Sequence, residues 1–242
     1  MPSIQPTSIT PEQFMAYNAA WKKMVNGAGA GSLRNYFASS GGLINYVYLP
    51  VAMANAIMVA EPVSIALGFV LMPGSPTATF SMVVAGVDSN NYLKTPCYLA
   101  GVGGRAAVVT QPGDYVLPDN ALAAIPFEQA ADWINAFNAL SAEGLGTAQF
   151  DSGFEAGRLC GYDYPLNDFT GALSGPQPAN AALWFNFVLH PSTPQFSTVL
   201  TMNSVPTETN PGTIILSSAL AYYDVALPCP PRPPFAVVPT MA

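Results

Sequence analysis

The sequence predicts an α+β protein made of two tandem pseudo-repeats, each with an N-terminal amphipathic helix packed on a mainly antiparallel sheet. The chain of 242 residues resembles itself, because Glu12-Gln13 recurs as Glu128-Gln129 at an offset of 128 − 12 = 116 positions. Helical periodicity occurs once in each half, and a pair of apolar β-runs follows it. Helices followed by strands, without regular βαβ alternation, are typical of α+β folds.

A helix is expected to open each pseudo-repeat, at about residues 10–25 and 126–141. Its apolar positions recur at i, i+3, i+7 and i+10, which places them on one helix face. They are Phe14, Tyr17, Trp21 and Met24 in the first half and Ala130, Trp133, Phe137 and Leu140 in the second. Thr10 and Gln13 have the spacing of a capping box, and Pro11 occupies the first helical position, so the first helix should begin there.

Two β-runs then follow in each half, joined by a short Pro-containing loop, which is the signal of an antiparallel hairpin. The runs are 63–72 with 80–88 in the first half and 182–190 with 196–204 in the second. The matching letters are Phe69-Val-Leu-Met-Pro73 with Phe187-Val-Leu-His-Pro191, and Phe80-Ser with Phe196-Ser. A further strand is expected in each half, at 105–110 and 213–223.

An aromatic stretch lies between helix and hairpin in both halves. There, Tyr46-Val-Tyr48 matches Tyr162-Asp-Tyr164, again at an offset of 116. Four matches in the same order support two lobes related by a pseudo-two-fold axis. The predicted division is an extended N-terminal arm (1–9), a first lobe (10–117), a second lobe (118–227) and a Pro-rich tail (228–242).

The tail is expected to be extended, because its proline density excludes helix and central strand and favours a polyproline conformation. Its C-P-P-x-P-P run spans Cys229 to Pro234, and the first half contains Gly86-Val-Asp88 after the F-V-L-x-P and F-S motifs. With these motifs, one repeat plus the tail resembles a group of uncharacterised small proteins found in Bacteroidota. The resemblance implies no activity, cofactor or site residue, and the present chain departs from the group in its duplication and low charge.

Composition excludes several classes of protein. Only 9% of the residues are charged, with seven Lys or Arg against fourteen Asp or Glu for a net charge of −7, whereas an average domain is about one quarter charged. Scattered cations do not suit nucleic-acid binding. The apolar stretch 43–72 is interrupted by polar residues and prolines, so no membrane span is expected. No secretory signal is visible at the N-terminus, and both extracellular assembly and a cytoplasmic location stay open.

Candidate catalytic groups are few. His190 is the sole histidine, and its counterpart in the first half is Met72, which favours a structural role. The acidic residues Asp151, Glu155, Asp163 and Asp168 fall within eighteen positions. Paired carboxylates serve in glycoside hydrolysis or calcium binding, but the favoured interpretation is that they are solvated loop acids or turn formers.

No cofactor or metal site is predicted from the remaining motifs. The run Gly101-Val-Gly-Gly-Arg105 precedes an apparent strand and matches neither a P-loop nor a dinucleotide fingerprint. Cys97, Cys160 and Cys229 are too few and too widely spaced for a disulfide framework or a zinc site. Cys97 and Cys160 are interpreted as small buried residues, while the disulfide state of the three stays open.

These observations favour a non-enzymatic structural subunit that assembles with copies of itself into a filament, tube, sheet or shell. Uncharged surfaces promote association, and interface cores are poor in charge and rich in aromatics and Met. The predicted assembly contacts are Phe235, Val237, Val238 and Cys229. The alternative is a carbohydrate- or peptide-binding module with its ligand on Tyr46, Tyr48, Tyr162 and Tyr164, and the third hypothesis is a hydrolase that uses the clustered carboxylates.

Overall fold

Two stacked antiparallel sheets form the centre of the molecule. The computed structural model describes residues 4–27, 33–39, 42–74, 78–104, 107–111, 124–140, 144–151, 157–174, 177–190, 195–207, 213–217, 222–223 and 227–229. Within these residues, four α-helices surround two six-stranded sheets. All strand pairs inside both sheets are antiparallel. The predicted α+β class with mainly antiparallel sheets is therefore confirmed.

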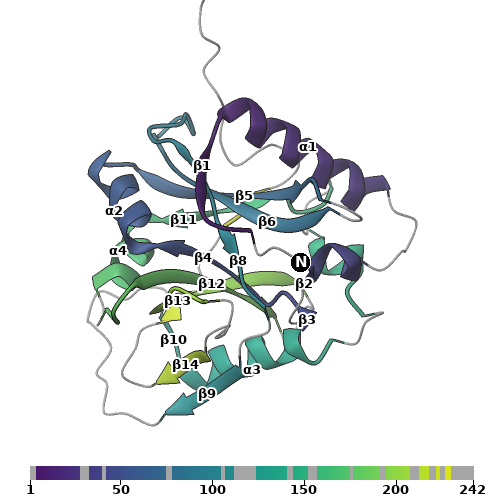
Figure 1. Cartoon of the computed structure of the whole chain (residues 1–242), viewed down its shortest axis with the longest axis vertical. Coiled ribbons are helices and arrows are strands. Elements are labelled where there is room, and N and C mark those ends of the chain that lie inside the picture. The colour runs from purple at the N-terminus through teal and green to yellow at the C-terminus, as the bar shows by residue number, and fades with distance from the viewer. Residues whose placement is uncertain are drawn as a thin grey trace, which may run out of the picture.

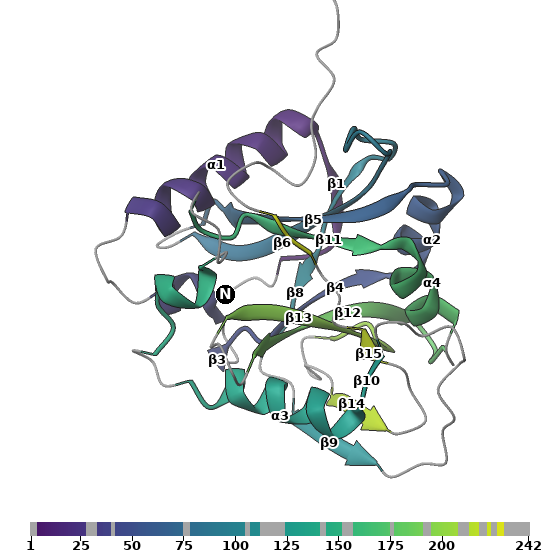
Figure 2. The ribbon, with the colours of Figure 1, turned by 180° about the vertical axis from the view of Figure 1, so that it is seen from behind.

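The helices cover the outer faces and one end of the stack (Figure 1). They are α1 (Pro11–Gly27), α2 (Val51–Val59), α3 (Phe127–Asn138) and α4 (Leu166–Ser174). Two 3-10 turns, η1 (Leu33–Phe37) and η2 (Thr147–Phe150), complete the helical elements of the described chain. α1 packs on the first sheet and α3 on the second, while α2 and α4 lie together at the opposite end from η1 and η2 (Figures 1 and 2).

Both sheets contain strands from both halves of the chain. The first sheet has the order β1 (Thr7–Ile9), β7 (Cys97–Leu99), β6 (Thr79–Val87), β5 (Ser64–Met72), β11 (Gly161–Pro165) and β16 (Leu227–Cys229). The second has the order β10 (Ala124–Ile125), β15 (Tyr222–Tyr223), β13 (Phe196–Ser204), β12 (Ala181–Leu189), β4 (Tyr46–Pro50) and β8 (Gly101–Val102). Each sheet thus takes four strands from one half of the chain and two from the other.

This exchange of strands was not anticipated by the division into two lobes. The aromatic strand β4 of the first half pairs with β12 of the second, and β11 of the second half pairs with β5 of the first. The helices α2 and α4 follow β4 and β11 and lead the chain back into the other sheet. The predicted boundary between residues 117 and 118 falls outside the described residues.

The first helix begins as the capping box predicts. The Thr10 backbone N–H donates to Gln13 Oε1 at 2.9 Å, and the Gln13 backbone N–H donates to Thr10 Oγ1 at 3.2 Å. α1 starts at Pro11, whose missing N–H is not needed in the first turn. Phe14 and Trp21 of the predicted apolar face are buried.

The two predicted hairpins are present, with ends within one residue of the expected ranges. β5 pairs with β6 from Ser64–Val87 to Met72–Thr79, and β12 pairs with β13 from Ala181–Ser204 to Leu189–Phe196. The further strand expected at 105–110 is β9 (Ala107–Gln111), and the segment expected at 213–223 contains β14 (Thr213–Ser217) and β15. β9 and β14 pair in parallel with each other. A short ribbon joins β2 (Ala38–Ser39) to β3 (Gly42–Leu43).

The terminal segments lie at sheet edges where they are described. β1, within the predicted N-terminal arm, pairs with β7. β16, at the start of the predicted tail, pairs with β11 and places Pro228 on an edge strand, which is where a sheet tolerates proline. The assembly residues predicted at 235, 237 and 238 lie outside the described residues.

Rings from both halves fill one end of the core between the sheets. Phe37 stacks on Phe80 with ring centroids 4.3 Å apart, and Phe150 packs on Phe196 at 4.7 Å. Contacts between the hairpins cross from one half to the other, with Phe80 at 5.7 Å from Phe187 and Phe69 at 5.6 Å from Phe196. Aromatic pairs at such spacings add about 0.5–1.5 kcal/mol each to the burial term, so this cluster holds the two halves together.

Candidate functional site

The four tyrosines predicted as a ligand surface are core residues. Tyr46, Tyr48, Tyr162 and Tyr164 are between 0 and 3% exposed. A ligand at the protein surface cannot reach rings buried to this degree. The structure therefore corrects the expectation of a tyrosine surface, and no exposed aromatic cluster at these positions supports a carbohydrate- or peptide-binding module.

The two tyrosine pairs also face opposite ways. Tyr46 and Tyr48 lie on the outer face of the second sheet, beneath α3, where Tyr46 stacks on Trp184 with ring centroids 3.8 Å apart. Burial raises the pKa of both hydroxyls. Gly103 is required here, since a Cβ at that position would come within 1.8 Å of the Tyr46 ring.

Tyr162 and Tyr164 point instead into the core between the sheets. The Tyr164 hydroxyl donates to the Thr198 carbonyl oxygen at 2.7 Å and lies 2.6 Å from Thr198 Oγ1. The Tyr162 hydroxyl donates to the carbonyl oxygen of Phe196. Both hydroxyls therefore tie β11, in the first sheet, to β13, in the second.

A shift of one residue explains why matching letters adopt opposite orientations. β4 pairs Tyr48 with Trp184, and the equivalent ladder pairs Asp163 with Ala66. Relative to their hairpins, Tyr48 and Asp163 thus occupy the same place, at an offset of 115 rather than 116. Because side chains alternate along a strand, a one-residue slip reverses every orientation.

The four clustered carboxylates are placed in different surroundings. Asp151 is exposed, and its Oδ2 lies 2.8 Å from Arg158 Nη1. Asp163 lies on β11, and Asp168 is buried in the first turn of α4. Glu155 lies outside the described residues. Nothing described supports a catalytic carboxylate pair, and no group of three or more His, Cys, Asp or Glu in the described part of the chain is placed to hold a metal ion.

Burial, more than any charged neighbour, sets the ionisation of the two inner carboxyls. It raises the pKa of Asp163, against a hydrogen bond from Ser64 that lowers it, and it raises the pKa of Asp168. Asp163 Oδ1 and Asp168 Oδ2 are buried without a hydrogen-bond partner. A raised pKa is common at functional sites, but these two carboxyls belong to a sheet face and a helix end.

The remaining nucleophile and base candidates are part of the fold. His190 is half-buried after β12, with its ring centroid 4.8 Å from that of Trp133. Cys97 and Cys160 are buried free thiols, which confirms their interpretation as small core residues. Burial raises the pKa of Cys97 to about 11, so its reactive thiolate form is rare at neutral pH. Cys229 lies on β16 opposite Gly161, but its side chain is outside the described atoms.

The surface itself offers a different candidate, on the outer side of α2. Ala54 and Ile57 face the core, and the other side of the helix is exposed. The exposed positions on this side carry Ala52, Asn55, Ala56 and Val59. Val59 is 83% exposed, and Val63, between α2 and β5, is 57% exposed. We call Ala52, Ala56, Val59 and Val63 the α2 patch.

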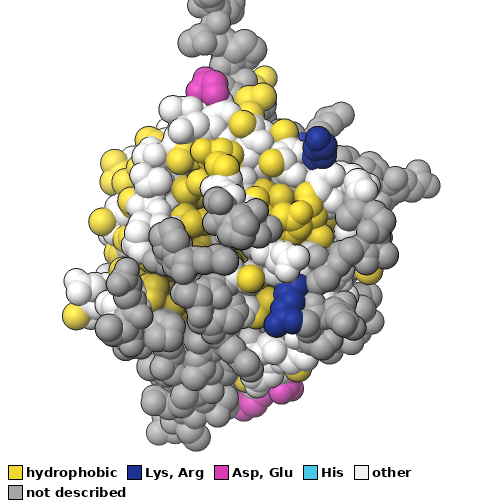
Figure 3. Space-filling view, turned by 45° about the vertical axis from the view of Figure 1, so that its right-hand side comes forward, with side chains coloured by type: hydrophobic (Ala, Val, Ile, Leu, Met, Phe, Trp, Pro, Cys, Tyr) yellow, Lys and Arg dark blue, Asp and Glu magenta, His cyan; other side chains and the backbone are white. Residues whose placement is uncertain are grey.

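Charge is sparse on the surface that Figure 3 displays, where hydrophobic side chains form broad areas and Lys, Arg, Asp and Glu occur as isolated groups. The sequence signal for the α2 patch was the apolar stretch 43–72, whose exposed residues could not be distinguished from its buried residues by composition.

Among the described residues, no helix is both long and apolar enough to cross a membrane.

Comparison with known proteins adds no relative. No model of a protein family matches the chain, and neither a curated protein nor a solved structure matches it. The resemblance to Bacteroidota proteins stays a prediction. Functional inference consequently depends on the chain's own surface and topology.

Proposed function

We propose that this protein is a non-enzymatic structural subunit that assembles with copies of itself, and that the α2 patch is a contact between copies. The observation that carries this proposal is the exposure of valine at positions that the fold does not require to be apolar. Two of the four large hydrophobic side chains that are exposed in the described chain, Val59 and Val63, belong to this patch, and exposed apolar surface is typical of protein–protein contacts.

The helix α4 provides a comparison for α2 within the same chain. α4 follows β11 as α2 follows β4, and both helices have nine residues. At the exposed positions, α4 carries Asn167 and Ser174 where α2 carries Ala52 and Val59. The same position in the same fold therefore accepts polar side chains, so folding alone does not explain the apolar face of α2.

We also propose that the two halves are copies of one duplicated unit. The strand orders of the two sheets correspond from edge to edge, with β1 in the place of β10 and β5 in the place of β12. The helix and hairpin matches at offsets of 116 and 118 agree with that correspondence. Under this proposal, the different chemistry of α2 and α4 arose after duplication.

The geometry of the assembly depends on which surface of the neighbouring copy the α2 patch contacts. A patch that pairs with its own copy closes a two-fold dimer, whereas a patch that meets another surface produces rings or open filaments. Filaments, tubes, sheets or shells need the second arrangement or a further contact. Phe235, Val237 and Val238 of the tail are proposed for that further contact on their sequence alone.

The test is a change in association when the patch becomes polar. Val59→Ser combined with Val63→Ser should raise the concentration at which sedimentation velocity detects oligomers by about tenfold or more, because burial of one valine contributes about 1.5–3 kcal/mol. Ser174→Val, which gives α4 the apolar side chain of α2, tests whether a second patch strengthens association.

Met15→Ser is the matched control, because Met15 is 56% exposed on α1, outside the patch. It should leave association unchanged. Negative-stain microscopy of the wild type at increasing concentration then distinguishes closed dimers from filaments, sheets or shells. A wild-type chain that stays a monodisperse monomer at every concentration would contradict the proposal.

A further inference from the structure

Neither half of the chain completes a sheet by itself. The first half supplies β1, β7, β6 and β5 to the first sheet but sends β4 and β8 to the second. The second half does the reverse, with β11 and β16 in the first sheet. A half on its own would leave a two-stranded ribbon, which is marginally stable at best in water.

The exchanged strands are held by matching contacts in both sheets. The Phe69 backbone N–H donates to the Cys160 carbonyl oxygen at 2.9 Å, and the Phe187 backbone N–H donates to the Asn45 carbonyl oxygen at 2.8 Å. Each bond joins a hairpin of one half to the residue just before the incoming strand of the other half. They continue the β11·β5 and β12·β4 ladders.

Polar side chains add further bonds between the halves. The Trp21 indole Nε1 donates to the Leu159 carbonyl oxygen at 2.8 Å, and Asn45 Nδ2 donates to Asn138 Oδ1 at 2.9 Å. Most of these groups are buried, and an unpaired buried polar group is costly. A half is therefore an incomplete unit whose complement is the other half.

We propose that two copies of this chain exchange halves, so that β11 of one copy completes the first sheet of the other. Every ladder and buried bond between halves is retained in such a dimer. The two halves are joined by residues 112–123, and the length of this connection sets the effective concentration that favours the single chain. Reciprocal exchange closes a dimer, and successive exchange gives an open chain.

This proposal uses the contact between the halves and does not depend on the α2 patch. A Val59→Ser, Val63→Ser background therefore separates the two. If the Val59→Ser, Val63→Ser chain associates as strongly as the wild type, through exchange alone, the proposed function is wrong and the exchange stands. If exchange is not detected while the wild type forms oligomers that Val59→Ser with Val63→Ser weakens, the exchange is wrong and the proposed function stands.

Cross-linking two different singly substituted chains tests the exchange directly. Ala66 and Asp163 are opposite each other in the β5·β11 ladder, and directly opposed residues lie within disulfide reach. Chains with Ala66→Cys and chains with Asp163→Cys, both also carrying Cys229→Ser, are unfolded together, refolded at high concentration and oxidised. Exchange predicts a disulfide-linked dimer that contains one chain of each kind.

Two controls make the result decisive. Ala66→Cys mixed with Ser174→Cys should give no such dimer, and a single chain with both Ala66→Cys and Asp163→Cys should form the bond internally. Absence of the mixed dimer, while the internal bond forms, overturns the proposal.

Discussion

Asp168 is a carboxyl held away from water. It is 5% exposed in the first turn of α4, and its Oδ2 accepts no hydrogen bond. The N-terminal end of a helix favours a carboxylate, yet the pKa of Asp168 is raised by burial. Desolvation consequently outweighs the helix dipole at this residue, and the ionised side chain opposes folding.

The raised pKa of Asp168 determines how the stability of the folded chain changes with pH. A group with a raised folded pKa keeps its proton longer in the folded chain, so its ionisation favours unfolding as pH rises above the ordinary value of 3.8. Asp168→Asn should therefore raise the melting temperature relative to wild type at about pH 7, and the difference should shrink towards about pH 3. Thermal unfolding followed by circular dichroism measures both.

Asp132→Asn, on the exposed side of α3, controls for the removal of one negative charge. A wild type that is more stable than Asp168→Asn at neutral pH would show that the carboxylate has a favourable partner. The buried position of Asp168 could not be predicted from the sequence, because a lone acid near a helix start has the same pattern whether it caps the helix or faces the core.

The orientation of the four tyrosine side chains also could not be predicted from the sequence. Tyr46-Val-Tyr48 and Tyr162-Asp-Tyr164 match at both tyrosines, but their rings lie on opposite sides of their sheets. Orientation depends on register with a partner strand from the other half of the chain. A local comparison contains no information on that register, so the burial of these residues could not be predicted from it.

At the scale of elements, β11 depends on a glycine at its first residue. A Cβ on Gly161 would lie 2.0 Å from the Leu67 carbonyl oxygen of β5, and this neighbour is backbone that cannot rotate away. Gly161→Ala should therefore separate the strands locally and lower the free energy of unfolding by about 1–3 kcal/mol, as measured by urea denaturation.

Gly27→Ala serves as the comparison, since a Cβ there meets no atom within 4 Å. It should leave the free energy of unfolding nearly unchanged or raise it slightly. Equal stability of Gly161→Ala and wild type would mean that β11 shifts easily, which would contradict a ladder that fixes the two halves together.

Elements with periodic patterns were predictable, and the exchanging elements were not. The helices α1 and α3 and both hairpins have apolar spacing or flanking turns that reveal them. α2 is apolar on nearly all sides, so it shows no helical period. β4 lacks alternation because both of its faces are buried. These two elements determine which sheet the chain enters.

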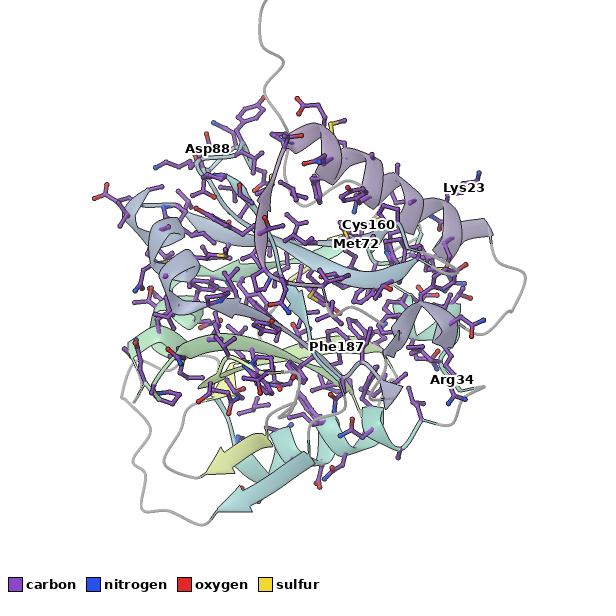
Figure 4. The ribbon with its side chains drawn as sticks, viewed as in Figure 1. Lys23, Arg34, Met72, Asp88, Cys160 and Phe187 are labelled. Carbon is purple, nitrogen blue, oxygen red and sulfur yellow. The ribbon has the colours of Figure 1, made fainter. Side chains whose placement is uncertain are left out.

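At the scale of the whole molecule, the charged side chains that the structure describes are exposed or half-buried, with Asp168 as the exception. Figure 4 shows Lys23, Arg34 and Asp88 on the outside of the fold and Phe187 in its interior. The self-comparison predicted two similar halves, whereas the exchange of strands between them is a long-range property. Predicting it requires the crossing helices α2 and α4, neither of which was expected from the sequence.

The low charge also predicts how association responds to salt. The chain carries a net charge of −7, so copies repel one another weakly, and the contacts proposed between them are apolar. Raising the ionic strength from about 0.1 M to about 1 M shortens the screening length from about 10 Å to about 3 Å. Repulsion then falls while apolar burial is retained, and association measured by sedimentation velocity should stay constant or increase. Dissociation by salt would instead show that ion pairs hold the copies together, which would exclude the α2 patch as the main contact.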